Sequence, residues 1–167
     1  MLQYDYEESI GYWIMGAAHE LQRALNEELA AHGITFRQWE VLALISLKGN
    51  QSQSELAEQM RLEAPTLVGV LDRMERDGWI VRETDTADRR RKIVRPTSQV
   101  EPVWNRMVEC ARSIRARATE GIAEAELHTL RDCLLKVRGN LAGDKTPVLA
   151  PDPKRSQVAR EASEEAS

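Results

Sequence analysis

The sequence predicts a mainly α-helical fold that carries one small β-hairpin. Most of the chain shows apolar residues at helical spacing, and two helix starts carry a capping box, Thr35 with Gln38 and Ser52 with Glu55. Near the middle, two short β-type runs flank a strongly basic loop. These features predict helices on both sides of a compact hairpin.

The first two predicted helices are long and apolar on one side. The first spans Tyr6 to about Ala31 and ends before Gly33. The second runs from its cap at Thr35 to Gly49. The apolar residues of the first are Ile10, Ile14, Ala17, Leu21 and Leu25, and those of the second are Trp39, Val41, Leu42, Leu44, Ile45 and Leu47.

A pair of shorter helices joined by a tight turn is predicted next. Ser52 begins the first, which ends near Met60, and Ala64 and Pro65 open the second, which runs to about Asp77. Proline is tolerated in a first helical turn because its missing N–H would have no partner there. The stripe that should face a core is Leu67, Val70, Leu71 and Met74, and the opposite face carries Thr66, Val68, Gly69, Arg73 and Arg76.

That opposite face suits insertion into the major groove of DNA. Small residues let the backbone approach the base edges, while Thr and Arg supply hydrogen-bond donors. An amphipathic surface helix without a DNA role would show the same pattern.

The hairpin that follows makes the DNA interpretation more specific. Gly78 should end the helix, and strands are predicted at 79–82 and 93–95, the second stopped by Pro96. From Arg89 to Arg95 the chain holds five cations and no anion. A cationic hairpin tip beside two such helices can reach a minor groove. We expect Asp88 to pair with Arg90 and to aim the tip.

Two further helices are predicted after the hairpin, from 98 to about Thr119 and from Ala123 or Ala125 to Leu141. One small domain cannot cover this much apolar surface, so we expect these helices and the first to form a twofold homodimer interface. The predicted organisation is a helical dimerisation region at 6–32 and 98–141 and a DNA-binding domain at 34–97. A disordered tail follows at 143–167, with a short helix possible at 156–165.

Composition and motifs exclude several classes of protein. The chain has 167 residues, 42% of them hydrophobic, with a net charge of −4, and holds no apolar run long enough to span a bilayer. The acidic N-terminus does not resemble a secretory signal, and we expect a cytoplasmic location.

Cys110 and Cys133 are too few and too far apart for a disulfide framework or zinc site. His19, His32 and His128 lack metal-ligand spacing, and no catalytic motif occurs, so we predict neither a metal nor a cofactor nor an enzyme.

The segment LDRMERDGWI, followed by a strand and then TADRRRK, resembles the MarR family of winged helix-turn-helix transcription factors. The resemblance extends from Tyr6 to Leu141. It implies a homodimer that binds a palindromic operator, usually as a repressor, with Ala64–Asp77 as recognition helix and Asp85–Lys92 as wing. Gly69 departs from similar members, which often carry a cationic or polar residue there, and this departure leaves the base preference open.

The residues that we expect to contact DNA are Ser54, Pro65, Thr66, Val68, Gly69, Arg73, Arg76, Arg82, Thr84, Asp88, Arg89, Arg90, Arg91 and Lys92.

The resemblance also implies a small-molecule effector. Members of the family often bind aromatic acids or phenols between the dimer core and the winged domain, and aromatic and Met side chains suit flat ligands. Trp13, His19, Arg37, Trp39 and Met107 are the candidate lining residues. Two alternatives stay open: a thiol-based oxidative sensor on the same scaffold, and a winged-helix module whose basic hairpin docks on an acidic protein.

Overall fold

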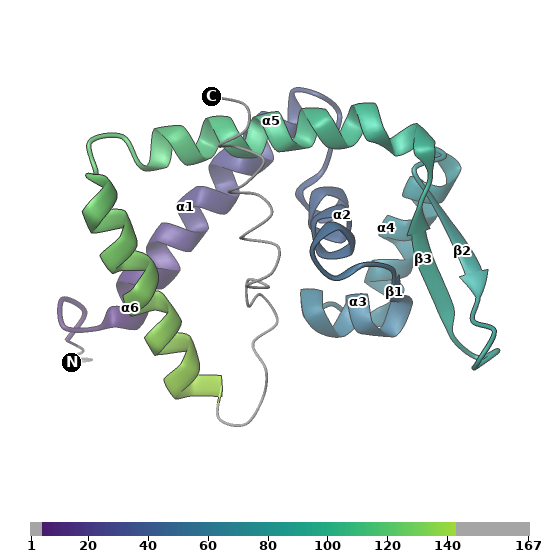
Figure 1. The fold of residues 1–167 in the computed structure, drawn as a ribbon, viewed down its shortest axis with the longest axis horizontal. Helices are drawn as coiled ribbons and strands as arrows, with labels where there is room; N and C mark the ends of the chain where they lie inside the picture. Colours follow the sequence, from purple (N-terminus) through teal and green to yellow (C-terminus); the bar gives the residue numbers. More distant parts are fainter. Residues whose placement is uncertain (1–4, 143–167) are drawn as a thin grey trace, which may run out of the picture. The chain divides into compact units, whose positions relative to one another are not determined.

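The structure is a computed structural model, and it describes residues 5–142. This part of the chain contains six α-helices and a small antiparallel sheet, which confirms the predicted fold class (Figure 1). The helices are α1 (Ile10–Ala30), α2 (Phe36–Lys48), α3 (Gln53–Met60), α4 (Ala64–Arg76), α5 (Glu101–Ala118) and α6 (Glu124–Ala142). The strands are β1 (Gln51–Ser52), β2 (Ile80–Thr84) and β3 (Lys92–Pro96).

The helix starts follow the capping chemistry of the sequence. Both predicted capping boxes are present, so each pair satisfies free backbone N–H groups reciprocally. The predicted start of α1 at Tyr6 is wrong. The helix begins at Ile10 because the Ser9 hydroxyl accepts a hydrogen bond from the Tyr12 N–H, at 3.3 Å.

The sheet differs from the prediction in extent. Its strand order is β1-β3-β2, and the two-residue strand β1 is too short to show an alternating pattern in the sequence. Trp79 lies outside β2, whereas Lys92 and Pro96 lie inside β3. Pro96 can occupy a central strand because it stands at the end of the ladder, opposite Ile80 and beyond the two positions that pair with β1.

The end of α4 depends on a glycine. Gly78 follows the C-cap residue Asp77 and has φ +74°, a left-handed conformation that confirms the predicted helix stop. A Cβ at this position would lie 2.5 Å from the Gln99 side-chain oxygen, so the flexible Gln99 side chain would have to move; the left-handed backbone is the stronger reason for glycine.

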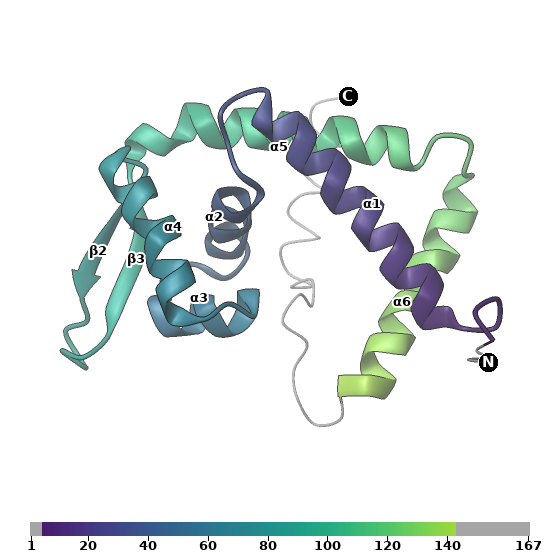
Figure 2. The same ribbon diagram turned by 180° about the vertical axis from the view of Figure 1, so that it is seen from behind.

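One hydrophobic core fixes α4 in place. Its predicted stripe is buried, with each of the four residues at most 3% exposed. The second half of α1 closes the core with Leu25 and Leu29, and α5 does so with Met107 and Ile114. Figure 2 shows α1 and α5 crossing on the side of the molecule away from α3. Ile80 of β2 and Val94 of β3 belong to the same core, so α4 and the hairpin are built on one core.

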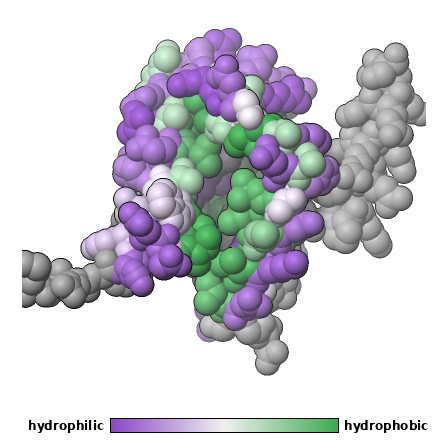
Figure 3. Space-filling model, turned by 90° about the vertical axis from the view of Figure 1, so that its left-hand side faces the viewer, coloured by the Kyte–Doolittle hydropathy of each residue, from purple (hydrophilic) through white to green (hydrophobic). Residues whose placement is uncertain are grey.

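The structure divides into two compact units, and the division falls between Glu120 and Gly121. In the second unit, α6 has no buried residue, although Leu130, Leu134 and Leu141 are among its large apolar side chains. In the first unit, the first half of α1 exposes Ile10, Trp13 and Met15, among other residues. Apolar residues (green) are prominent on the face shown in Figure 3. The predicted tail at 143–167 and its short helix lie outside the described residues.

None of the helices between residues 5 and 142 is both long enough and apolar enough to cross a membrane.

Candidate nucleic-acid interface

The outward face of α4 carries the residues that the sequence singled out for base contact. Because the apolar stripe is buried, Pro65, Thr66 and Val68 are exposed near the start of the helix, and Arg73 and Arg76 near its end. Gly69 is half-buried, and only Arg73 Nη1, at 4.0 Å, comes near the position that a Cβ would take. Ser54, on the neighbouring helix α3, is also exposed. The face thus divides into an uncharged first half and a charged second half.

The hairpin tip at 85–91 is held by its own backbone and two aspartates. The Asp85 carboxylate accepts from the Ala87 N–H at 2.9 Å, and that of Asp88 accepts from the Arg90 N–H at 3.0 Å. Asp88 Oδ1 also lies 3.5 Å from Arg90 Nε, which confirms the predicted pair. The Arg90 side chain is nevertheless 94% exposed, so its guanidinium remains available to a ligand. The predicted pair therefore orients a cation without burying it.

Arg82 does not project into solvent as a free cation. Its guanidinium pairs with Glu75 of α4 and lies 2.7 Å from Asp72 Oδ1, and its side chain is 20% exposed. The Arg82 N–H donates to the second Glu75 oxygen at 3.0 Å. The hydrogen bonds from Arg82 lower the pKa of the Glu75 carboxyl below its ordinary value. In this structure Arg82 ties β2 to α4, a role that the sequence prediction missed.

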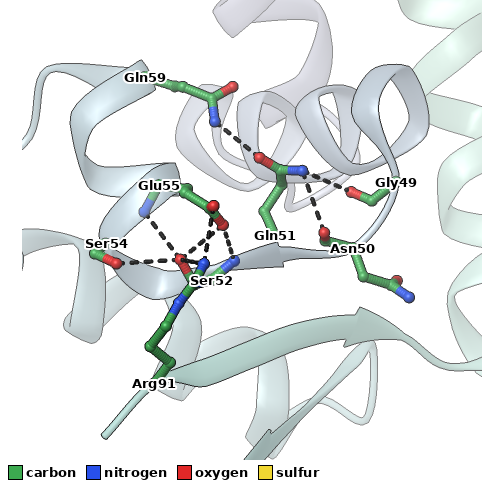
Figure 4. Close-up of polar contacts among 8 residues, drawn as sticks. All are labelled: Gly49, Asn50, Gln51, Ser52, Ser54, Glu55, Gln59 and Arg91. Carbon is green, nitrogen blue, oxygen red and sulfur yellow. Dashed lines mark hydrogen bonds and ion pairs between the residues drawn. The ribbon is translucent and has the colours of Figure 1, made fainter. Parts of the chain in front are cut away.

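Arg91 is likewise engaged inside the domain. Figure 4 shows its side chain extending toward the start of α3, where Arg91 Nη2 donates to Glu55 Oε1 at 2.9 Å and to Ser52 Oγ at 3.2 Å. Hydrogen bonds from Ser52 are the main cause that lowers the pKa of the Glu55 carboxyl, and Arg91 adds to them. Local sequence patterns do not predict this contact, because Glu55 and Arg91 are 36 positions apart in the chain.

The remaining hairpin residues lie on the surface of the two strands. Lys92 Nζ donates to the Thr84 hydroxyl at 2.8 Å, and Arg95 pairs with Glu83 at 2.8 Å. Between residues 5 and 142, Arg89 and Lys92 have no carboxylate within ion-pair distance, unlike the other cations of the hairpin. The block of positive charge seen in the sequence is therefore largely matched by carboxylates.

The candidate effector residues do not share one site. Trp13 and His19 line the same open hollow on one side of α1. Arg37 pairs with Glu40 at 2.6 Å, and Trp39 packs on the core. Met107 is fully buried, so its side chain cannot line an open crevice in this structure. The proposed grouping of these five residues is not seen.

The two cysteines differ in environment. Cys110 is buried in α5, and its burial raises the pKa of the thiol, which disfavours the reactive thiolate. Cys133 of α6 is exposed.

Helix, turn and recognition helix, followed by a hairpin attached to the same core, define the class of winged helix-turn-helix proteins. A model of the MarR family matches residues 34–92, the region of these elements, and confirms the family resemblance. This is a family of transcriptional regulators and not of enzymes.

Solved structures of MarR-family regulators are similar to the chain over most of its length. Wild-type MarR from E. coli, in its apo form, has a TM-score of 0.70 and 25% identity, covering 77% of this chain and 96% of its own. A mutant of the same protein complexed with operator DNA has a TM-score of 0.68 and 25% identity, covering 81% and 99%. CouR from Rhodococcus jostii, bound to p-coumaroyl-CoA, has a TM-score of 0.69 and 22% identity, covering 85% and 100%. The chain therefore has the fold of MarR-family transcriptional regulators.

Proposed function

We propose that the protein is a homodimeric, sequence-specific DNA-binding regulator, a repressor that a small aromatic effector releases from its operator. The observation that carries the proposal is the outward face of α4, which presents Thr66, Arg73 and Arg76 next to an arginine-tipped hairpin. Because its ligand is operator DNA, we assign the protein to the cytoplasm.

Two recognition helices would enter successive major grooves, about 34–36 Å apart, so the operator should be nearly palindromic. The residues that we place on DNA are Ser54, Pro65, Thr66, Val68, Gly69, Arg73 and Arg76 of the helix-turn-helix, with Arg89, Arg90 and Lys92 of the hairpin.

The dimer is supported by apolar surface that the single chain leaves uncovered. The first half of α1 and the whole of α6 expose large side chains, including Trp13, Met15 and Leu141. Obligate interfaces have this apolar character. A twofold pairing of these helices would bury them.

The effector is supported by the similarity to CouR, which was solved with p-coumaroyl-CoA. Trp13 and His19 remain the candidate contacts, because they line the open hollow on α1. An acyl-aromatic ligand bound there would favour one spacing of the two recognition helices and thereby weaken operator binding.

The protein-docking alternative is less well supported. Val68 is the one large apolar residue exposed on α4, whereas a protein-docking helix should expose several.

The DNA proposal is tested with a duplex selected by the wild-type protein from random sequences. We expect Arg73→Ala and Arg90→Ala to weaken binding at least about fivefold, with the Arg90 variant also lowering the salt dependence by about one unit. Arg112→Ala, at an exposed site on α5, is the matched control and should bind normally. Failure of the wild type to select any sequence would refute the proposal.

A further inference from the structure

The backbone pairing that joins β3 to the neighbouring strand β1 does not extend to the hairpin tip at 85–91. Strand β1 pairs with β3 only at Val94 and Ile93, so this pairing stops before the tip begins. The Arg91 side chain continues the attachment beyond that point, because it crosses from the first residue before β3 to the start of α3. Arg89 and Arg90 directly precede it in the chain.

Glu55 takes part in two structures at once. Its Oε2 atom accepts from the Ser52 N–H at 2.8 Å, and the Ser52 hydroxyl accepts from the Glu55 N–H at 3.3 Å, which together form the capping box of α3. The Ser52 hydroxyl also donates to Oε2 at 2.7 Å. Its Oε1 atom binds Arg91 at 2.9 Å. The same carboxylate therefore fixes the start of α3 and holds the hairpin tip (Figure 4).

We infer that Ser52 and Glu55 form an anchor for the hairpin tip, and that Arg91 is a positioning residue rather than a DNA contact. The anchor sets the direction in which Arg89 and Arg90 reach the duplex. This inference rests on the proposed function only for its effect on DNA binding, since the anchor itself exists without DNA.

A competing interpretation makes the opposite prediction. If Glu55 merely masks a cation that belongs to the DNA-binding surface, removing its charge should free Arg91 to bind a phosphate. Operator affinity would then rise, and the salt dependence would steepen by about one unit. If Glu55 is an anchor, removing its charge should loosen the tip and lower operator affinity.

The decisive variant is Glu55→Gln in the full chain. Glutamine still completes a capping box, so α3 keeps its start, while the ion pair with Arg91 is lost. Glu58→Gln is the matched control, because it removes an exposed carboxylate of the same helix that has no ion pair between residues 5 and 142. We expect Glu55→Gln to weaken operator binding about threefold to tenfold, and Glu58→Gln to leave it unchanged.

A double-mutant cycle separates anchoring from direct contact. Arg91→Gln and Glu55→Gln should weaken binding to a similar extent, and combining them should add little to either change. Additive losses, or tighter binding by Glu55→Gln, would overturn the inference.

Amide hydrogen exchange of the free protein provides the readout that does not involve DNA. The N–H groups of Ala87, Arg90 and Arg91 are hydrogen-bonded within the tip, so a loosened tip should exchange them faster in Glu55→Gln than in Glu58→Gln. Equal exchange in the two variants would refute the anchor. Faster exchange in a protein that selects no DNA would support the anchor and refute the proposed function instead.

Discussion

At the scale of single residues, the main finding is how the arginines near the recognition helix are divided. Arg82 binds carboxylates of α4 and Arg91 binds a carboxylate of α3, whereas Arg90 is oriented by Asp88 and remains exposed. An arginine that already binds two acceptors in its own domain gains little binding free energy from contacting a DNA phosphate, because it would have to give up those contacts. We therefore expect the salt dependence of operator binding to be smaller than the number of arginines in the hairpin implies.

Gly69 provides a residue-scale prediction. Glycine in a helix interior is less stable than alanine by about 0.5–1 kcal/mol, and a Cβ here would meet no atom closer than 4.0 Å. Gly69→Ala should therefore stabilise the folded protein, measured by urea unfolding, by about that amount. It should also weaken operator binding, because the methyl group lies on the face that we place against DNA. Unchanged binding would remove Gly69 from that face.

At the scale of elements, two contacts join the hairpin to the helices. Arg82 links β2 to α4, and Arg91, the residue before β3, links the hairpin tip to α3. These contacts lie on opposite edges of the hairpin, in addition to the pairing of β3 with β1. We therefore expect the hairpin and both helices to move as one unit when an effector binds.

The contact between Arg82 and Glu75 predicts a dependence of stability on pH. The pKa of Glu75 is lowered in the folded state, so its contribution is complete above the ordinary carboxyl pKa of about 4.3 and is lost as the pH falls through the folded-state pKa. Glu75→Gln should lower the free energy of unfolding at pH 7 by up to about 1 kcal/mol, because the side chain is partly exposed. In urea titrations, the difference from wild type should vanish in acid. A difference that persists there would mean that packing, rather than charge, is lost.

The elements themselves could largely be predicted from the sequence, because their signals are local. The capping boxes at Thr35 and Ser52, the stripe of α4 and the stop at Gly78 each depend on residues within one helical turn or next to it. The partners of Arg82 and Arg91 could not be predicted, since they depend on how the hairpin packs against two helices. The same limit applies to Met107, which the sequence marks as apolar without saying which surface it faces.

At the scale of the whole molecule, binding to a palindromic operator requires a dimer. Leu21 of α1 is 46% exposed and lies one turn before Leu25, which is buried in the core, so the apolar stripe of α1 continues past the region that the single chain covers. Leu21→Asp should shift the protein toward monomer in sedimentation-velocity experiments, because a charge in an apolar interface is costly. Asn26→Asp, at an exposed polar site of the same helix, is the control for the added charge. Equal dimerisation of both variants would place the interface elsewhere.

In the proposed complex, two copies of α4 read one duplex from two successive major grooves. This arrangement is tested by sequencing the duplexes that the wild-type protein selects from a random library. We predict a near-palindrome whose half-site centres lie about one helical turn, 10–10.5 base pairs, apart. A selected sequence without twofold symmetry, or with half-sites at a spacing that places the two helices on opposite sides of the duplex, would contradict it.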